Sequence, residues 1–196
     1  MDGSRLAAIR VGALRWAYEV LQQPLVVLDT ETTGLDRRDQ VVQIAVIDET
    51  GEPLLLRLIK PSVPITRDAI RIHGITPDMV RDAPTFPEVY PELVAVLANR
   101  TIIAYNAAFD RQMLNQTCWA YQLKEFPRKP WHCAMLRFAE YYGQWHPARQ
   151  AFKWQKLGDA CAFLDIPGTG AHSALGDARM TLRLVQRMAE LYAGEK

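Results

Sequence analysis

The stretch Pro24–Leu35 (P-L-V-V-L-D-T-E-T-T-G-L) constrains the fold more than any other part of the chain. A short run of Leu and Val bounded by Pro and Gly is typical of a buried strand. Asp29 and Glu31 stand at the end of this run with one residue between them. Because side chains two positions apart share one face of a strand, we expect both carboxylates to point the same way.

Two neighbouring carboxylates repel each other and are costly to remove from water unless a cation or protons lie between them. Oxygen ligands of this kind suit a hard divalent cation such as Mg²⁺. The stretch taken alone is equally compatible with a polar turn that ends a strand. The rest of the chain must therefore distinguish a metal site from a turn.

With 196 residues, 49% of them hydrophobic and 23% charged, the chain is typical of one globular protein with a full core. The formal net charge of +1 gives no general attraction for nucleic acid, which would have to rely on local basic patches. The three cysteines form no C-x-x-C pair and indicate reduced thiols in an intracellular protein. No segment has the pattern of a membrane span or a signal peptide, so we expect a cytoplasmic protein with no membrane partner.

The N-terminal segment Ser4–Gln22 predicts an amphipathic helix, because its apolar side chains recur every three or four residues. We expect this helix to pack on the domain as an extra layer, with docking of a partner as the alternative. The chain is accordingly divided into an N-terminal helical extension, residues 1–24, and a main domain, residues 25–196.

The main domain begins with an antiparallel meander and continues with alternating helices and strands. After the opening strand, the predicted strands are Val41–Ile47, Pro53–Lys60, Thr101–Ala104 and Trp131–Cys133. The predicted helices are Phe86–Ala98, Asn106–Leu123, a segment from Cys133 to about Tyr142, Trp154–Leu164 and Ala174–Tyr192. Gly143–Lys153 is expected to be an aromatic and basic loop, which either steers phosphates and stacks bases or is ordinary solvated surface. This order predicts an α/β fold with a mixed sheet flanked by helices.

Two further acids and a histidine follow later in the chain. Asp110 falls in the first turn of a helix, where the helix dipole favours a carboxylate, so simple capping is an alternative role. Asp177 points inward from the last helix, and a buried aspartate needs a partner or a metal ion. His172 precedes it by five residues, in a loop from which it can reach over the same site or merely cap the helix.

The order D-x-E, N-x-x-F-D, H-x-x-x-x-D resembles the DEDDh (DnaQ-like) family of 3′–5′ exonucleases, and is similar to the proofreading ε subunit of bacterial replicative DNA polymerase. The resemblance covers about residues 25–192 and is supported by I-H-G-I-T at Ile72–Thr76. It implies a ribonuclease-H-like fold with a mixed five-stranded sheet, and it makes residues 25–196 an exonuclease domain.

In that family four acids hold two divalent ions, Mg²⁺ or Mn²⁺, a role that the resemblance gives to Asp29, Glu31, Asp110 and Asp177. Two such ions roughly 4 Å apart can clamp the attacking and leaving oxygens of an in-line displacement. The resemblance makes His172 the general base for the attacking water, a task suited to an imidazole that titrates near neutral pH. The expected product is a nucleoside 5′-monophosphate.

The resemblance also implies contacts with the 3′-terminal nucleotide. The residues at matching positions are Thr32, Gly34, Leu35, Asp68, His73, Asn106 and Phe109. For Leu35, Asn106 and Phe109, a role in the core or as a helix cap is the alternative.

The sequence therefore predicts a nucleoid-associated 3′–5′ exodeoxyribonuclease that acts on single-stranded DNA in proofreading or repair, with a DNA polymerase subunit as a candidate partner. Two alternatives stay open: the same chemistry on RNA, and a catalytically silent, polymerase-associated binding subunit. The complete set of acids and histidine argues against the silent subunit, because a scaffold has no physical need for clustered buried charges.

Overall fold

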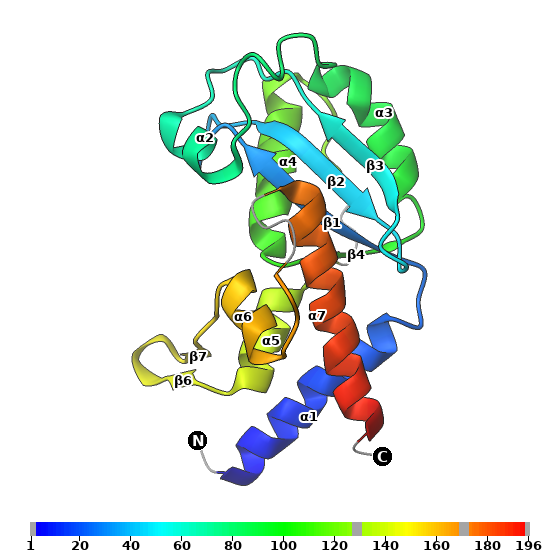
Figure 1. Cartoon of the computed structure of the whole chain (residues 1–196), viewed down its shortest axis with the longest axis vertical. Coiled ribbons are helices and arrows are strands. Elements are labelled where there is room, and N and C mark those ends of the chain that lie inside the picture. The colour runs from blue at the N-terminus through cyan, green and yellow to red at the C-terminus, as the bar shows by residue number, and fades with distance from the viewer. Residues whose placement is uncertain (1–2, 127–130, 169–172, 195–196) are drawn as a thin grey trace.

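A computed structural model describes residues 3–126, 131–168 and 173–194 of the chain. Its centre is a five-stranded sheet with the strand order β3-β2-β1-β4-β5 (Figure 1). Strands β1 to β3 form an antiparallel meander, whereas β4 and β5 run parallel to β1. The strands are β1 (Leu25–Thr32), β2 (Val41–Ile47), β3 (Pro53–Leu58), β4 (Thr101–Ala104) and β5 (Trp131–Cys133). The predicted mixed sheet is confirmed.

Helices cover both faces of this sheet, and β1 is buried between them. Leu25 and Val27 pack on one face with α1 (Gly3–Val20), α5 (Ala134–Tyr142), α6 (Leu157–Phe163) and α7 (Ala174–Gly194). Val26 and Leu28 pack on the other face with α3 (Phe86–Leu97) and α4 (Ala107–Ala120). This alternation follows from the period of two residues along a strand. None of the helices in the described ranges is both long and apolar enough to cross a membrane.

Helix α1 shares the core of the first face. It crosses the C-terminal part of α7 (Figure 1), where the rings of Tyr18 and Tyr192 lie 5.6 Å apart. The indole N–H of Trp16 donates to Nδ1 of His132 at 3.0 Å and joins α1 to β5. The apolar face of the helix is thus covered by the rest of the chain.

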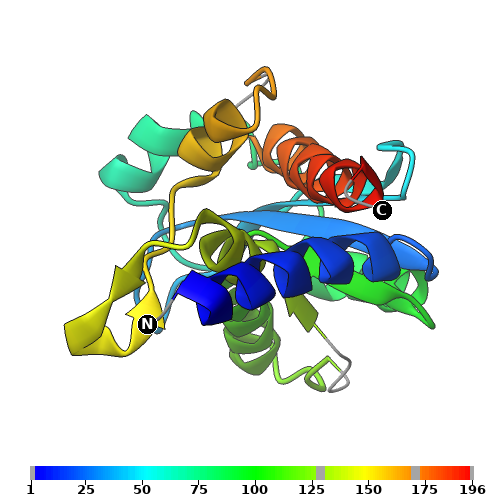
Figure 2. The same ribbon diagram turned by 90° about the horizontal axis from the view of Figure 1, so that it is seen from below.

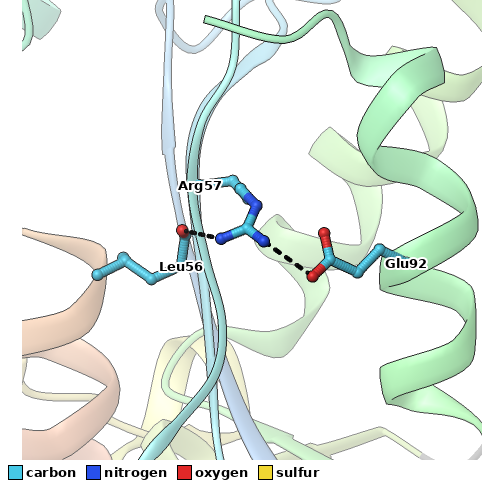
Figure 3. Close-up of polar contacts among 3 residues, drawn as sticks. All are labelled: Leu56, Arg57 and Glu92. Carbon is cyan, nitrogen blue, oxygen red and sulfur yellow. Dashed lines mark hydrogen bonds and ion pairs between the residues drawn. The ribbon is translucent and has the colours of Figure 1, made fainter.

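The outer edge of the sheet is β3, which a basic side chain joins to α3. The guanidinium of Arg57 donates to the backbone oxygen of Leu56 and to Oε1 of Glu92, both at 3.0 Å (Figure 3). A charged residue on an edge strand discourages pairing with another chain. Because Arg57 and Glu92 are both nearly half exposed, the pair contributes at most about 1 kcal/mol to stability.

The segment Gly143–Lys153 is a short hairpin and not the predicted loop. Its two strands pair Trp145 with Phe152, whose rings meet edge to face at a centroid distance of 5.2 Å. Figure 2 shows this hairpin projecting from the helical layer. Strands of two residues are too short to produce a readable period in the sequence. The hairpin consists of β6 (Trp145–His146), the 3₁₀ turn η1 (Pro147–Arg149) and β7 (Ala151–Phe152).

The helix predicted for Trp154–Leu164 begins three residues later, at Leu157. The residues between β7 and α6 have no regular secondary structure, and a distant tyrosine holds them in place. The hydroxyl of Tyr105 donates to the backbone oxygen of Gln155 at 2.9 Å. Such a tertiary contact is not visible in the local sequence pattern.

Candidate active site

Strand β1 carries two carboxylates on one face near its carboxyl end. Asp29 and Glu31 flank Thr30, whose side chain points to the opposite face. Their face is that of Val27, which packs with α7. The apolar residues that precede them are buried on both faces of the sheet. A shift of the strand by one residue would turn the carboxylates and these core side chains to the opposite faces together.

The third carboxylate comes from the first turn of α7. Oxygen atoms of Asp29, Glu31 and Asp177 all lie within 4.8 Å of one another. The start of α7 is held on the sheet by its Ala174 N–H, which donates to Oε1 of Gln43 at 3.1 Å. Gln43 lies directly opposite Glu31 in the pairing of β1 with β2. This hydrogen bond thus joins α7 to β2, the strand that pairs with β1 beside the acid cluster.

The fourth acid, Asp110, approaches from α4 and occupies an open edge of β1. Strand β4 pairs with β1 only as far as Val27, so the later backbone groups on that edge lack a strand partner. Oδ1 of Asp110 fills this place by accepting the N–H of Thr30 at 3.1 Å and its hydroxyl at 2.8 Å. These two bonds use one oxygen of a carboxylate that is only 3% exposed.

Burial disfavours the charged forms of Asp29, Glu31 and Asp110, and neighbouring carboxylates add to this effect at Asp29 and Glu31. Burial, reinforced by the charges of Asp110, Asp177 and Glu31, raises the pKa of Asp29 well above its usual range. Burial, reinforced by the charges of Asp177 and Asp110, raises the pKa of Glu31 to about 7. Burial raises the pKa of Asp110 to about 7 despite its hydrogen bonds from Thr30. At neutral pH the cluster therefore needs bound protons or a bound cation.

The donor set fits a divalent metal ion. Within the described ranges, no ion pair joins Asp29, Glu31 or Asp110 to a basic side chain. Closely spaced carboxylate oxygens are the ligands that Mg²⁺ and Mn²⁺ prefer, and a cation among them would remove the repulsion. His172 lies outside the described residues, so its position over the cluster stays a prediction.

A cavity of about 390 Å³ adjoins the cluster through Glu31. Six of the seven residues that the sequence associates with the terminal nucleotide line it: Thr32, Gly34, Leu35, Asp68, His73 and Phe109. The seventh, Asn106, is not among the residues that line this cavity. It immediately precedes α4 with an exposed side chain, and its backbone oxygen accepts the N–H of Phe109 at 2.8 Å.

The turn after β1 requires glycine at one wall of this cavity. The carboxylate of Asp39 closes the turn by accepting the Thr33 hydroxyl at 2.5 Å and the Asp36 N–H at 2.6 Å. A Cβ atom at Gly34 would lie 2.6 Å from Oδ2 of Asp39, well inside van der Waals contact. Glycine therefore lets the turn close and presents the next residue, Leu35, to the cavity with 78% of its surface exposed.

His73 fastens α2 (Arg67–His73) to the same wall in a neutral form. Its Nδ1 accepts the N–H of Ile75 at 2.9 Å, so Nε2 carries the proton and donates to the backbone oxygen of Thr32 at 3.2 Å. Burial lowers the pKa of His73, which favours this neutral tautomer.

Several residues of the site escaped the sequence analysis, among them Ile72, Gln43 and Thr30. Ile72 lines the cavity with 60% of its surface exposed, although it belongs to the quoted motif I-H-G-I-T. The sequence does distinguish Gln43, since it is the one polar residue in the strand V-V-Q-I-A-V-I. Nothing in the sequence distinguishes Thr30, because its bond to Asp110 depends on where β4 ends.

Comparison with known proteins identifies relatives along most of the chain. The model of the RNase_T family, described as Exonuclease, matches residues 26–185. An uncharacterized exonuclease, CP81, of Escherichia phage 186 is 37% identical over 191 residues, which are 94% of this chain and 95% of that protein. The DNA polymerase III subunit epsilon of Rickettsia felis is 29% identical over 181 residues, which are 87% of this chain and 75% of that protein.

Longer relatives and solved structures agree with this result. The PolC-type DNA polymerase III of Thermotoga maritima is 31% identical over 170 residues, and the matched region is 12% of that protein's length. The fold is similar to that of a 3′-exonuclease solved for its recognition of the histone mRNA stem-loop. That comparison has a TM-score of 0.69 at 19% identity and covers 86% of this chain and 82% of the other. The expected ribonuclease-H-like fold is thereby confirmed.

Proposed function

Because the chain belongs to the RNase_T exonuclease family, we propose that it is a metal-dependent 3′–5′ exodeoxyribonuclease acting on single-stranded DNA in proofreading or repair. The observation that supports this best is the meeting of Asp29, Glu31 and Asp177 within 4.8 Å beside a nucleotide-sized cavity. A partly buried cluster of like charges costs stability, so a structural role alone does not account for it.

Under this proposal Asp29, Glu31, Asp110 and Asp177 would hold divalent ions. When bound, the ions would supply an activated water and would stabilise the departing 3′ oxygen of an in-line displacement. Thr30 orients Asp110 through its N–H and hydroxyl. His172 takes the proton of the attacking water, and the product is a nucleoside 5′-monophosphate.

The cavity walls suit a terminal nucleotide whose base leaves the stack. Leu35 and Ile72 expose apolar surface to the cavity, and Phe109 adds an aromatic side chain. Contact with a base would cover this apolar surface, at a gain of about 25 cal/mol per Å². The bond from His73 to Thr32 keeps the facing backbone in place.

The choice of DNA rests on the named relatives. The Rickettsia felis protein is a subunit of a DNA polymerase, and on that basis we also propose a DNA polymerase subunit as the partner of this chain. The fold shared with a 3′-exonuclease that recognises histone mRNA makes RNA the substrate to test against.

A 5′-labelled single-stranded DNA oligonucleotide tests the proposal. We expect Mn²⁺ or Mg²⁺ to produce a ladder that shortens from the 3′ end, and we expect EDTA or Asp110→Asn to abolish it. A matched RNA strand in the same tube measures the preference between the two substrates. Faster loss of the RNA would replace the DNA assignment with an exoribonuclease. Survival of both strands in every metal would leave the catalytically silent binding subunit as the remaining hypothesis.

A further inference from the structure

The hairpin of β6 and β7 carries a second cavity that the acid cluster does not use. Its volume is about 480 Å³, and it is distinct from the cavity beside Glu31. The hairpin is a defined element, because the Lys153 N–H donates to the Gln144 oxygen at 2.8 Å and extends the pairing beyond Phe152. The turn passes through Gln150 in the left-handed region, at a φ of 50°.

The side chains around this cavity combine positive charge with an exposed aromatic ring. Arg149, Lys153 and Lys156 line it, against the single carboxylate of Asp159. In the part of the chain that the structure describes, no ion pair involves any of these three cations. Trp154 lies among them with 52% of its surface exposed. A chain of net charge +1 thus concentrates unneutralised positive charge at one short element.

Contacts connect the cavity with the part of the fold that holds the acid cluster. Gln155, which lines it, is fixed by the hydroxyl of Tyr105, the residue that follows β4 at its carboxyl end. Lys156 occupies the N-cap position of α6, and Cys161 on that helix packs against α7, where its thiol donates to the backbone oxygen of Met180 at 3.9 Å. The cavity is therefore linked to the residue that follows β4 and, through α6, to α7, the helix that supplies Asp177.

From this juxtaposition we propose that the hairpin cavity binds single-stranded DNA on the 5′ side of the scissile phosphate, with Trp154 stacking on a base and Arg149 and Lys153 contacting backbone phosphates. The inference rests on the proposed function, since the bound segment belongs to the strand whose 3′ end enters the acid cluster. Exposed aromatic rings beside cations are the usual means of holding a single strand without reading its sequence.

Fluorescence anisotropy of a labelled 20-nucleotide single strand in EDTA measures this binding without hydrolysis. The test variants of the full chain are Trp154→Ala and the pair Arg149→Gln with Lys153→Gln. The matched control is Arg183→Gln with Arg187→Gln, which removes the same charge from the exposed surface of α7. Circular dichroism melting of every variant verifies that it is folded.

We expect the double hairpin variant to weaken binding at least 10-fold, and Trp154→Ala to weaken it at least about 5-fold, the lower limit for one stacked base. Loss of two phosphate contacts should reduce the slope of log affinity against log salt by about 1.4. The control pair should bind within twofold of the unmodified protein. An equal loss in the control pair, or a double hairpin variant within twofold of the unmodified protein, would overturn the proposal. So would hairpin-dependent binding that favours a blunt duplex over the single strand.

Hydrolysis of the p-nitrophenyl ester of thymidine 5′-monophosphate by the unmodified protein in Mn²⁺ separates the two proposals. This small substrate reaches the acid cluster without a strand. Ester hydrolysis together with unchanged hairpin variants would refute the hairpin alone. Absence of ester hydrolysis together with hairpin-dependent binding would refute the exonuclease, and with it the placement of the strand relative to a scissile phosphate, but would keep the hairpin as a binding site for single-stranded DNA.

Discussion

Replacing Glu31 with glutamine should stabilise the metal-free protein at alkaline pH. The pKa of Glu31 is about 7 in the folded protein, against an ordinary 4.5. Each pKa unit corresponds to about 1.4 kcal/mol, so keeping this carboxylate charged costs up to roughly 3 kcal/mol of folding free energy. Glutamine has nearly the same shape and no charge. We therefore expect Glu31→Gln to be more stable by about 1–3 kcal/mol at pH 8 in EDTA.

The sign of the pH dependence follows from proton binding. Between pH 4.5 and about 7 the folded protein holds a proton on Glu31 that the unfolded chain has lost. The stability of the unmodified protein should therefore fall as pH rises through this window, and the advantage of the variant should appear over the same window. Below pH 4.5 the two proteins should melt alike.

Melting by circular dichroism measures this effect directly. For a domain of this size, 1 kcal/mol shifts Tm by about 2–4 °C, so a rise of roughly 2–12 °C is expected for Glu31→Gln at pH 8 in EDTA. Glu49→Gln, on the exposed turn after β2, is the matched control and should leave Tm unchanged. Saturating Mn²⁺ should reverse the order by stabilising the unmodified protein more. An equal or lower Tm for Glu31→Gln in EDTA would refute the repulsion argued for the cluster.

Three further predictions concern the groups that hold the cluster in place. Thr30→Val removes the 2.8 Å hydrogen bond from the Thr30 hydroxyl to the charged Asp110 carboxylate. Mn²⁺ binding at pH 7, measured by calorimetry, should therefore weaken at least about 10-fold. Unchanged affinity would show that this bond does not contribute to metal binding. Gln43→Leu removes the acceptor of the Ala174 N–H, a hydrogen bond that contributes about 1 kcal/mol to stability. Tm should therefore fall by about 2–4 °C, and turnover should fall severalfold. Equal turnover would show that catalysis does not need this contact between α7 and the sheet. Mn²⁺ affinity should rise with increasing pH below about pH 7, by up to about 10-fold per pH unit for each of the two protons that Glu31 and Asp110 release, and a flat profile would contradict their raised pKa values.

Much of the fold could be predicted because it depends on local periods. The alternation along β1 places Asp29 and Glu31 on one face, and the apolar stripes of the last helix turn Asp177 inward. The hairpin of β6 and β7 could not be predicted, since its strands are two residues each and its exit depends on the distant Tyr105.

The sequence predicts site residues whose position is set by the helix or strand that carries them. It does not predict residues whose role depends on a contact between two elements. The meeting of acids from β1 and α7 is expected from the resemblance to the exonuclease family, which the order of the acids carries. The bond from Thr30 to Asp110 depends on the length of β4, which the sequence does not fix to a single residue. The closing of the turn at Gly34 depends on Asp39, five residues later, and reads in the sequence only as a polar stretch.

Binding of Mn²⁺ by the unmodified protein and by Asp177→Asn tests the central claim most directly. The claim is that carboxylates from β1 and α7 form one divalent-metal site that the exonuclease needs. Electron paramagnetic resonance counts free Mn²⁺ in a titration, and the same samples are assayed on the labelled strand. We predict that Asp177→Asn binds Mn²⁺ at least 10-fold more weakly and produces no ladder. Equal Mn²⁺ binding by the two proteins would contradict the assignment of Asp177 to the metal site.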